Sequence, residues 1–208
     1  MEIDDLNGLG SGMIRIGTFS SVATHYLPEI IRRFREQYPG IEYELLLGDY
    51  TEIEEWIENG RVDLGFLRLP TNPEFETIPL MQDELMAVIP ENHPLANLPK
   101  FPMEALCQDP FMLLEKGARA EISEVLDRHN LKPHIVFTTW DDYAVMYMVE
   151  SGLGISILPS LILQRINYRI LVKPLEDPAY RTIGVALKGR DRASLAVLRF
   201  LDYLVPQK

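Results

Sequence analysis

The sequence predicts a two-lobed α/β domain, and three observations carry this prediction. Stretches of strand type alternate with amphipathic helical stretches along most of the 208 residues. This alternation is typical of mostly parallel sheets, and it occurs twice, on either side of a proline-rich passage at residues 90–102. Ligands of open α/β sheets bind beside the carboxyl ends of strands and the N-termini of helices. Two such lobes in one chain therefore predict a ligand-binding cleft between them.

The first alternation contains five elements. They are expected as strands at residues 13–17, 41–47 and 62–67, with helices at residues 22–38 and 51–59. Leu27, Ile30 and Phe34 recur at helical spacing and predict the buried face of the first helix. Thr51 and Glu54 have the spacing of a capping box, so we expect them to begin the second helix.

The second alternation has the same form. Strands are expected at residues 111–114, 135–138 and 154–158, with helices at residues 118–129 and 141–151. Asp141 can cap the second of these helices, and Gly152 can close it. Two separate strands, at residues 170–172 and 182–187, and a last helix capped by Asp191 complete the prediction.

The charge of the chain narrows the classes of function. The formal net charge is −11. Phosphate contacts dominate nucleic-acid affinity, so we expect poor DNA binding by the chain as it stands. The acidity also disfavours binding to anionic membrane surfaces.

The sequence also predicts the compartment of the protein. No apolar run approaches the roughly 20 residues of a membrane span, and the first residues lack the pattern of a signal peptide. With a single cysteine, Cys107, this predicts a cytoplasmic protein without a disulfide.

Short motifs in a fixed order carry a further signal. They are Ile14-Arg15-Ile16-Gly17, Ser20-Ser21, Leu27-Pro28, Gly60-Arg61-Val62-Asp63-Leu64-Gly65, Glu91-Asn92-His93-Pro94-Leu95-Ala96, Asp109-Pro110-Phe111 and Gly152-Leu153-Gly154-Ile155-Ser156-Ile157-Leu158-Pro159. Each motif is short, but the ordered set spans residues 13–205. In this order it resembles the effector-binding domain of LysR-type transcription regulators.

The resemblance implies a fold and a division of the chain. The fold would be that of type 2 periplasmic binding proteins, with a cleft between two lobes and two crossover strands. Lobe I would be discontinuous and consist of residues 13–84 and 182–208, and lobe II would be residues 90–165. Residues 85–89 and 166–187 would form the crossover or hinge region, and residues 1–12 the remnant of a linker.

The resemblance also implies a function and its partners. A small effector, expected to be a carboxylate, would bind between the lobes, and closure would be transmitted to an attached DNA-binding domain. DNA would be bound through the family's winged helix-turn-helix, which we do not expect within this chain. A homodimer through the helices at residues 22–38 and 118–129 is expected, and a tetramer is possible in a full-length regulator.

Two other functions stay open. A solute-binding protein for a transporter would share the fold and would carry a secretory leader in its full gene. An enzyme would need a convergent acid/base pair, which the sequence does not supply, so we expect no catalytic residue and no cofactor. His129 and His134 do not share a helix face, so we expect no metal site.

The turn Gly17-Thr18-Phe19-Ser20-Ser21 predicts the ligand site of the first lobe. A serine at a helix start can cap the helix or bond a ligand, and the positive end of the helix dipole suits a carboxylate. We therefore expect Thr18, Phe19, Ser20 and Ser21 to bind the effector, although both serines are alternatively ordinary caps. Near the end of the third strand, Phe66 and Arg68 are further candidates, with core packing and a solvated charge as the alternatives.

In the second lobe the candidate ligand-binding residues are Gly117, Thr138, Thr139, Ile155 and Ser156. Gly117 stands in a turn that in many LysR-type domains carries hydroxyl side chains, but here the turn has none and would offer backbone N–H groups. Thr138 and Thr139 end a strand, with strand packing as the alternative. Ile155 and Ser156 would border the cleft by resemblance, and their alternative is a buried core strand.

Overall fold

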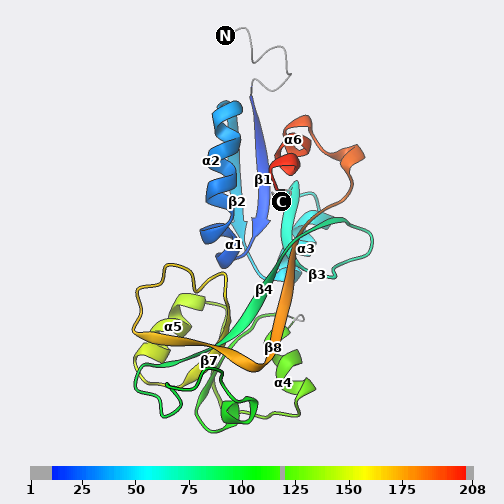
Figure 1. Ribbon diagram of the computed structural model, residues 1–208. Helices are drawn as coiled ribbons and strands as arrows, with labels where there is room; N and C mark the ends of the chain where they lie inside the picture. Colours follow the sequence, from blue (N-terminus) through cyan, green and yellow to red (C-terminus); the bar gives the residue numbers. More distant parts are fainter. Residues whose placement is uncertain (1–10, 118–119, 205–208) are drawn as a thin grey trace. The chain divides into compact units, whose positions relative to one another are not determined.

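The computed structural model describes residues 11–117 and 120–204 (Figure 1). These residues form two compact units, and both mix strands with helices, so the predicted α/β class is confirmed. Unit 1 comprises the described chain up to Gln82 and again from Thr182, and unit 2 is Asp83–Arg181. Most of the expected linker at residues 1–12 lies outside the described residues, and Gly12 already begins a strand.

The sheet of unit 1 is built around the strand β1. Its strands are β1 (Gly12–Thr18), β2 (Ile41–Leu47), β3 (Leu64–Leu69) and part of β8 (Ile170–Leu187), in the order β2-β1-β3-β8. β1 runs parallel to both neighbours, with Thr18 opposite Leu47 on one side and Ile16 opposite Leu64 on the other. β8 pairs antiparallel with β3. The three parallel strands therefore end at one edge, as the βαβαβ pattern predicts.

Two helices replace the single helix expected at residues 22–38, so that prediction was wrong. The helices are α1 (Ser20–His25) and α2 (Leu27–Gln37). The break falls at Tyr26, where φ is −117° and ψ is −55°. Pro28 follows at the second position of α2. Proline lacks the N–H that would bond the carbonyl one turn earlier, so a continuous helix loses a hydrogen bond at this point.

The helix α3 (Tyr50–Glu58) begins with a capping box, but not with the predicted one. The Asp49 carboxylate accepts a hydrogen bond from the N–H of Glu52 at 2.8 Å, and the Glu52 carboxylate accepts one from the N–H of Asp49 at 2.9 Å. The expected pair of Thr51 and Glu54 has the same spacing, but it lies inside the helix. Gly60 follows the end of α3 with a φ of +69°, which suits glycine.

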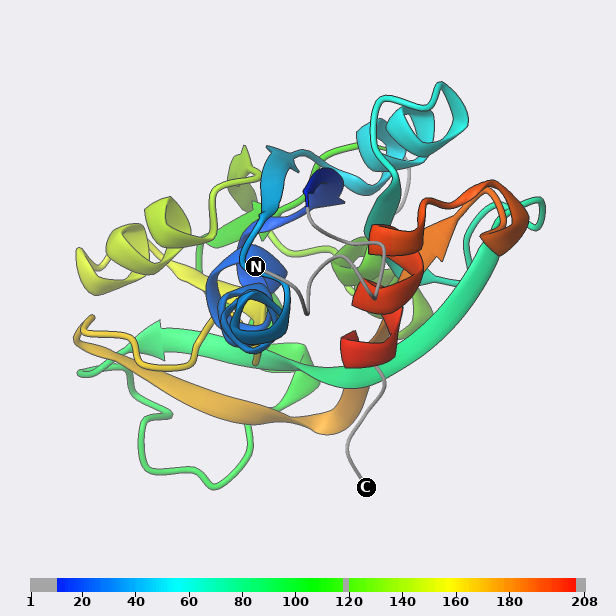
Figure 2. The same ribbon diagram turned by 90° about the horizontal axis from the view of Figure 1, so that it is seen from above.

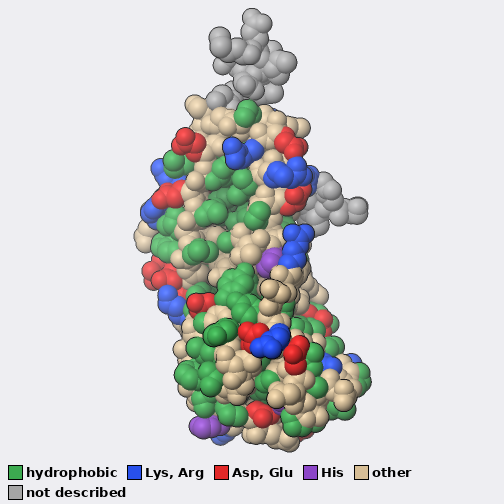
Figure 3. Space-filling view, turned by 90° about the vertical axis from the view of Figure 1, so that its left-hand side faces the viewer, with side chains coloured by type: hydrophobic (Ala, Val, Ile, Leu, Met, Phe, Trp, Pro, Cys, Tyr) green, Lys and Arg blue, Asp and Glu red, His purple; other side chains and the backbone are tan. Residues whose placement is uncertain are grey.

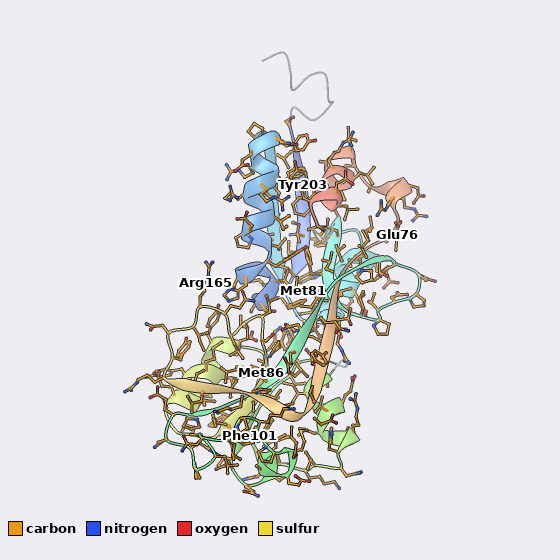
Figure 4. The ribbon with its side chains drawn as sticks, in the orientation of Figure 1. Glu76, Met81, Met86, Phe101, Arg165 and Tyr203 are labelled. Atoms are coloured by element: carbon orange, nitrogen blue, oxygen red, sulfur yellow. The ribbon has the colours of Figure 1, made fainter. Side chains whose placement is uncertain are left out.

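Aromatic side chains hold α2 against α6 (Leu195–Leu204) in unit 1. The ring of Phe34 lies 5.3 Å from that of Phe200 and 5.0 Å from that of Tyr203. Figures 1 and 2 both show α2 beside α6, and Figure 4 shows Tyr203 between them. The expected cap of α6, Asp191, lies instead in a short 3₁₀ turn, η2 (Arg190–Arg192), and the Ser194 hydroxyl accepts from the N–H of Val197 at 3.3 Å.

Unit 2 repeats the strand arrangement of unit 1. Its strands are part of β4 (Glu76–Pro90), β5 (Phe111–Leu114), β6 (Ile135–Thr139) and β7 (Ile155–Pro159), in the order β4-β7-β5-β6. β5 runs parallel to β6 and β7, and β7 pairs antiparallel with β4. The chain thus passes from unit 1 to unit 2 within β4 and returns within β8. The two strands expected at residues 170–172 and 182–187 are one strand, so their separation was wrong.

The helices of unit 2 cover an apolar core. They are η1 (Met103–Cys107), α4 (Glu121–Arg128) and α5 (Asp142–Glu150). Ile122, Val125 and Leu126 of α4 are buried, as predicted. Asp141 caps α5 by accepting from the N–H groups of Tyr143 and Ala144, which is also confirmed. Among residues 11–117 and 120–204, no helix has the length and apolar character needed to cross a membrane.

The capping box of α3 yields a stability prediction. Asp49→Ala removes the acceptor for a helix N–H, so we expect the free energy of unfolding to fall by about 1–2 kcal/mol. Thr51→Ala, the matched control from the alternative register, should change it by less than about 0.5 kcal/mol. Urea denaturation of both variants measures the difference, and an equal loss in both would rule out Asp49 as the cap.

Candidate functional site

The carboxyl ends of the parallel strands in unit 1 are joined by backbone and ring contacts. The carbonyl of Thr18, the last residue of β1, accepts a hydrogen bond from the N–H of Gly48 at 3.0 Å. The ring of Phe19 packs edge-on against that of Tyr50, with centroids 5.3 Å apart. The turn after β1 and the start of α3 therefore form one packed surface at this edge.

The N-cap residue of α1 does not cap the helix through its side chain, in contrast to the N-cap residue of α3. Phe19 occupies the N-cap position in an extended conformation, and an aromatic ring cannot accept the helix N–H groups as an Asp, Asn or Ser side chain does. Ser20 is half-buried and Ser21 is buried, so Ser20 is the more accessible hydroxyl. α1 has only 6 residues, so its dipole is shorter than that of the four-turn helix that we expected.

The two candidates on β3 differ in environment. Phe66 is fully buried, and its ring lies 5.9 Å from that of Tyr26 in an edge-on arrangement. This contact gives Phe66 a packing role in unit 1. Arg68 is half-buried and pairs with Ile183 of β8 through the backbone. Arg68 is the penultimate residue of β3, near the carboxyl edge at which β1 also ends.

An uncharged groove follows β3 in unit 1. It has a volume of about 570 Å³ and is lined by Leu69, Pro70, Thr71, Asn72, Pro73, Phe75, Thr77, Pro79 and Thr182. The Thr71 hydroxyl donates a hydrogen bond to the Glu54 carboxylate. Since no cationic side chain lines this groove, its chemistry suits a neutral group better than a carboxylate.

In unit 2 the ends of β5 and β6 lie side by side. Leu113 is opposite Thr138, and Leu114 is opposite Thr139. Thr138 is exposed, whereas the Thr139 hydroxyl accepts a hydrogen bond from the N–H of Asp141 at 3.2 Å. The two threonines therefore lie at the carboxyl edge of the sheet, which is the edge where ligands of α/β folds bind.

The turn after β5 differs from the expected helix start. α4 begins at Glu121 rather than at residue 118, so Gly117 precedes the helix by four residues and that boundary was wrong. Gly117 has a φ of +77°, a conformation that favours glycine. Ala118 and Arg119 lie outside the described residues. Glu115 accepts a hydrogen bond from the Ser123 hydroxyl at 2.6 Å, which ties the turn to α4.

The structure gives Ile155 and Ser156 roles in packing. Ile155 is 1% exposed, and Ser156 is completely buried. The Ser156 hydroxyl donates to the carbonyl of Met112 on the neighbouring strand β5 at 2.6 Å. Binding of a ligand to this hydroxyl would break that bond, so we leave Ile155, Ser156 and Phe66 out of the proposed site.

Two histidines, His93 and His129, have structural roles. The imidazole of His93 lies 3.0 Å from the Asp109 carboxylate and accepts from the N–H of Leu95. His129 contacts the carbonyl of Val125 and the carboxylate of Asp177, and the backbone contact is the first cause that raises its pKa. Over the described ranges, no three His, Cys, Asp or Glu side chains are grouped to hold a metal ion.

Asp49 is the residue that our sequence analysis missed at the edge of unit 1. Its signal was present, because Asp49 and Glu52 have the capping-box spacing as clearly as Thr51 and Glu54. The difference matters for the site. The capping box occupies the first turn of α3, whereas the N-cap residue of α1 makes no side-chain cap bond.

Comparison with known proteins identifies a family. The sequence profile described as "LysR substrate binding domain" matches residues 7–207. The transcriptional activator CmpR of Synechocystis is 31% identical over 208 residues, which cover 97% of this chain and 68% of CmpR. The crystal structure of HinK, a LysR family regulator of Pseudomonas aeruginosa, has a TM-score of 0.82 at 28% identity and covers 97% of this chain and 72% of its own.

A solved effector complex is also similar. The effector-binding domain of QuiR in complex with shikimate has a TM-score of 0.84 at 25% identity. The match covers 94% of this chain and 96% of the QuiR domain. The predicted fold, that of two-lobed periplasmic-binding-protein-like domains, is confirmed by these neighbours.

Two substitutions separate packing from binding in the turn after β1. Phe19→Ala removes a ring that is 3% exposed, so we expect the free energy of unfolding to fall by about 3–5 kcal/mol. Ser20→Ala should change it by less than about 0.5 kcal/mol, because the Ser20 hydroxyl caps no helix N–H. Thermal and urea denaturation measure both values. A large loss in Ser20→Ala would assign this hydroxyl to folding.

Proposed function

The chain belongs to the family of LysR substrate-binding domains, and from this premise we propose that its effector is a small carboxylate metabolite bound between unit 1 and unit 2. The observation that carries the choice of a carboxylate is the start of α1. This helix begins at the end of the central strand β1, and the side chain at its N-cap position, Phe19, does not cap it. Helix N–H groups without internal partners are ready donors to an anion.

The proposed contacts in unit 1 are Thr18, Phe19, Ser20, Ser21 and Arg68. A helix dipole contributes about 0.3–1 kcal/mol toward an anion. Micromolar affinity needs roughly 8 kcal/mol, so hydrogen bonds from serine, the Arg68 charge and apolar burial must supply most of the free energy. This requirement is the reason why we propose contacts from two units rather than from one.

The proposed contacts in unit 2 are Gly117, Thr138 and Thr139. The threonine hydroxyls can donate to a carboxylate or accept from a ligand hydroxyl. The QuiR domain, which binds shikimate, supports this class of ligand, because shikimate carries one carboxylate and several hydroxyls. Closure of the units on the ligand would then be the change that a regulator transmits.

The proposed readout is transcription control by a longer regulator. CmpR is a transcriptional activator, and this chain covers 68% of its length. We propose that a DNA-binding domain attached to this chain receives the signal in the cytoplasm. The matches to transcription regulators favour this role over that of a transporter's solute-binding protein.

We also propose that the domain forms a homodimer through the surfaces of α2 and α4. Unit 1 supports this with apolar side chains on its edge strand β2, where Leu45 is 43% and Leu47 is 63% exposed. Figure 3 views the side on which α2 and β2 lie in Figure 1, and it shows apolar side chains gathered between charged ones. Exposed apolar patches of this kind mark interaction surfaces.

The binding site is tested with ligands and one substitution. Small carboxylates, shikimate among them, are screened by thermal shift, where a ligand at 100 times its dissociation constant adds about 2.7 kcal/mol of stability. Ser20→Ala should weaken the best ligand by about 10- to 100-fold in calorimetry, since a hydrogen bond to a charged group contributes about 1.5–3 kcal/mol.

The control for this test is Ser151→Ala. Ser151 lies at the C-terminal end of α5, and its hydroxyl bonds the carbonyl of Tyr147. This variant should bind the ligand as the wild type does. The proposed site would be excluded if Ser20→Ala kept the wild-type affinity and NMR shift mapping placed the bound ligand elsewhere on the protein.

A further NMR measurement tests the enzymatic alternative. The ligand recovered after incubation with the protein should be chemically unchanged, and turnover of the ligand would revive the enzymatic alternative.

The dimer is tested by matched charge substitutions. Leu45→Glu places a charge on the edge strand β2 and should raise the dimer dissociation constant by about tenfold or more. Leu195→Glu is the control, because Leu195 is similarly exposed, at 42%, and stands at the start of α6, which is not one of the proposed contact elements. Light scattering across a concentration series measures both. An equal effect of the two substitutions, or a wild type that is monomeric at high concentration, would contradict the proposal.

A further inference from the structure

A buried ion pair lies in unit 2 where the chain enters and leaves it. Asp83 is the first residue of unit 2, on β4, and Arg181 is its last, on β8. The Arg181 guanidinium donates two hydrogen bonds to one Asp83 oxygen, from Nε at 2.9 Å and from Nη2 at 2.7 Å. The other Asp83 oxygen accepts from the Leu161 N–H at 2.8 Å and the Ser160 hydroxyl at 2.9 Å. This carboxylate therefore links β4, β8 and the turn after β7.

Two further carboxylates approach the same guanidinium. Glu121, the first residue of α4, has an oxygen 3.4 Å from Arg181 Nη1. Asp142, the first residue of α5, is 8% exposed, and its charge interacts with that of Arg181. Within the described chain, no salt bridge joins Asp142 to a cation. Burial of a carboxylate without such a partner disfavours its charged form.

The surroundings of Asp142 determine when it ionises. Burial is the largest cause that raises the pKa of the Asp142 carboxyl, to about 6. The charge of Arg181 on β8 lowers this pKa, and the charges of Asp141 and Glu121 raise it. Of the strands beneath α5, β5 is Phe-Met-Leu-Leu and β7 is Ile-Ser-Ile-Leu-Pro, so neither presents a titratable side chain. Among the described residues, the charged groups that act on Asp142 are Arg181, Glu121 and Asp141, and Arg181 is itself bound to Asp83.

We propose that Asp142 is a proton switch for the link between β4 and β8. With its proton bound, Asp142 does not compete with Asp83 and Glu121 for the Arg181 guanidinium. When the proton leaves to solvent, a third buried carboxylate competes for Arg181 and repels the other two. The link at the entry and exit of unit 2 is then weaker. This inference does not depend on the identity of the effector.

The sign of the pH effect follows from the direction of the shift. The pKa of Asp142 is raised from an ordinary value of 3.8 to about 6 by folding. Between these pH values the folded chain holds a proton that the unfolded chain has lost. The contribution of Asp142 to stability is therefore full below about pH 4, and it is lost as the pH rises to about 6.

The first test compares the wild type with Asp142→Asn, which has no charge at any pH. At pH 7.5 we expect the variant to have a folded-to-unfolded ratio about 10- to 100-fold above that of the wild type, since one pKa unit corresponds to a factor of ten. At pH 4.5 this advantage should shrink at least tenfold. Glu91→Gln, an exposed carboxylate just after β4, is the control and should show no such change. The same difference between wild type and Asp142→Asn at both pH values would overturn the proposal.

The second test uses the wild type and does not depend on the folding of a variant. A carbon-13 NMR titration of the Asp142 carboxyl should have its midpoint near pH 6, and a midpoint below about pH 4.5 would overturn the proposal. Hydrogen exchange of the Leu161 N–H, which donates to Asp83, reports the link itself. Its protection, corrected for the chemical exchange rate, should be at least about tenfold lower at pH 7.5 than at pH 4.5. Equal protection at both pH values would show that Asp142 titrates without loosening the link, and would refute the switch.

Discussion

The parallel pairing of one central strand with two neighbours is the constraint on which each unit depends. β1 lies between β2 and β3, and β5 lies between β6 and β7. Because parallel strands end at a common edge, this pairing places Thr18 beside Gly48 in unit 1 and Leu114 beside Thr139 in unit 2. Residues that are 30 or 25 positions apart in the chain thereby become neighbours at the carboxyl edge of each sheet.

The helices that follow these strands start in different ways, and this difference decides their chemistry. Asp49 fills the first turn of α3, and Asp141 fills that of α5. A carboxylate already bonded to the helix N–H groups excludes a second anion from the same place, by occupancy and by repulsion. α1 starts after Phe19, which has no such group. The lack of an N-cap side-chain bond in α1 is therefore a property of one residue type at one position.

The buried charges of unit 2 have a cost that apolar residues would avoid. An ion pair such as Arg181 and Asp83 loses its hydration on burial, and this loss often cancels the attraction. Its geometry offers something that an apolar pair lacks, because the carboxylate of Asp83 on β4 bonds two other segments, β8 and the turn after β7. We interpret the cluster as a device that specifies where β4 and β8 meet, and that responds to a proton on Asp142.

Local patterns in the sequence correctly predicted the order of the elements, the strands at residues 41–47 and 111–114 and the Asp141 cap. They also carried the family resemblance. They depend on neighbours a few residues away, which the sequence displays directly. The break at Tyr26, the choice of Asp49 over Thr51 and the burial of Ser156 required the folded chain, because competing local signals are settled by packing. The pairing of Arg181 with Asp83 joins residues 98 positions apart, and no spacing rule reaches that far. The turn after β1 was visible as a helix start, but only the structure showed that its N-cap residue is Phe19, whose ring cannot accept a helix N–H.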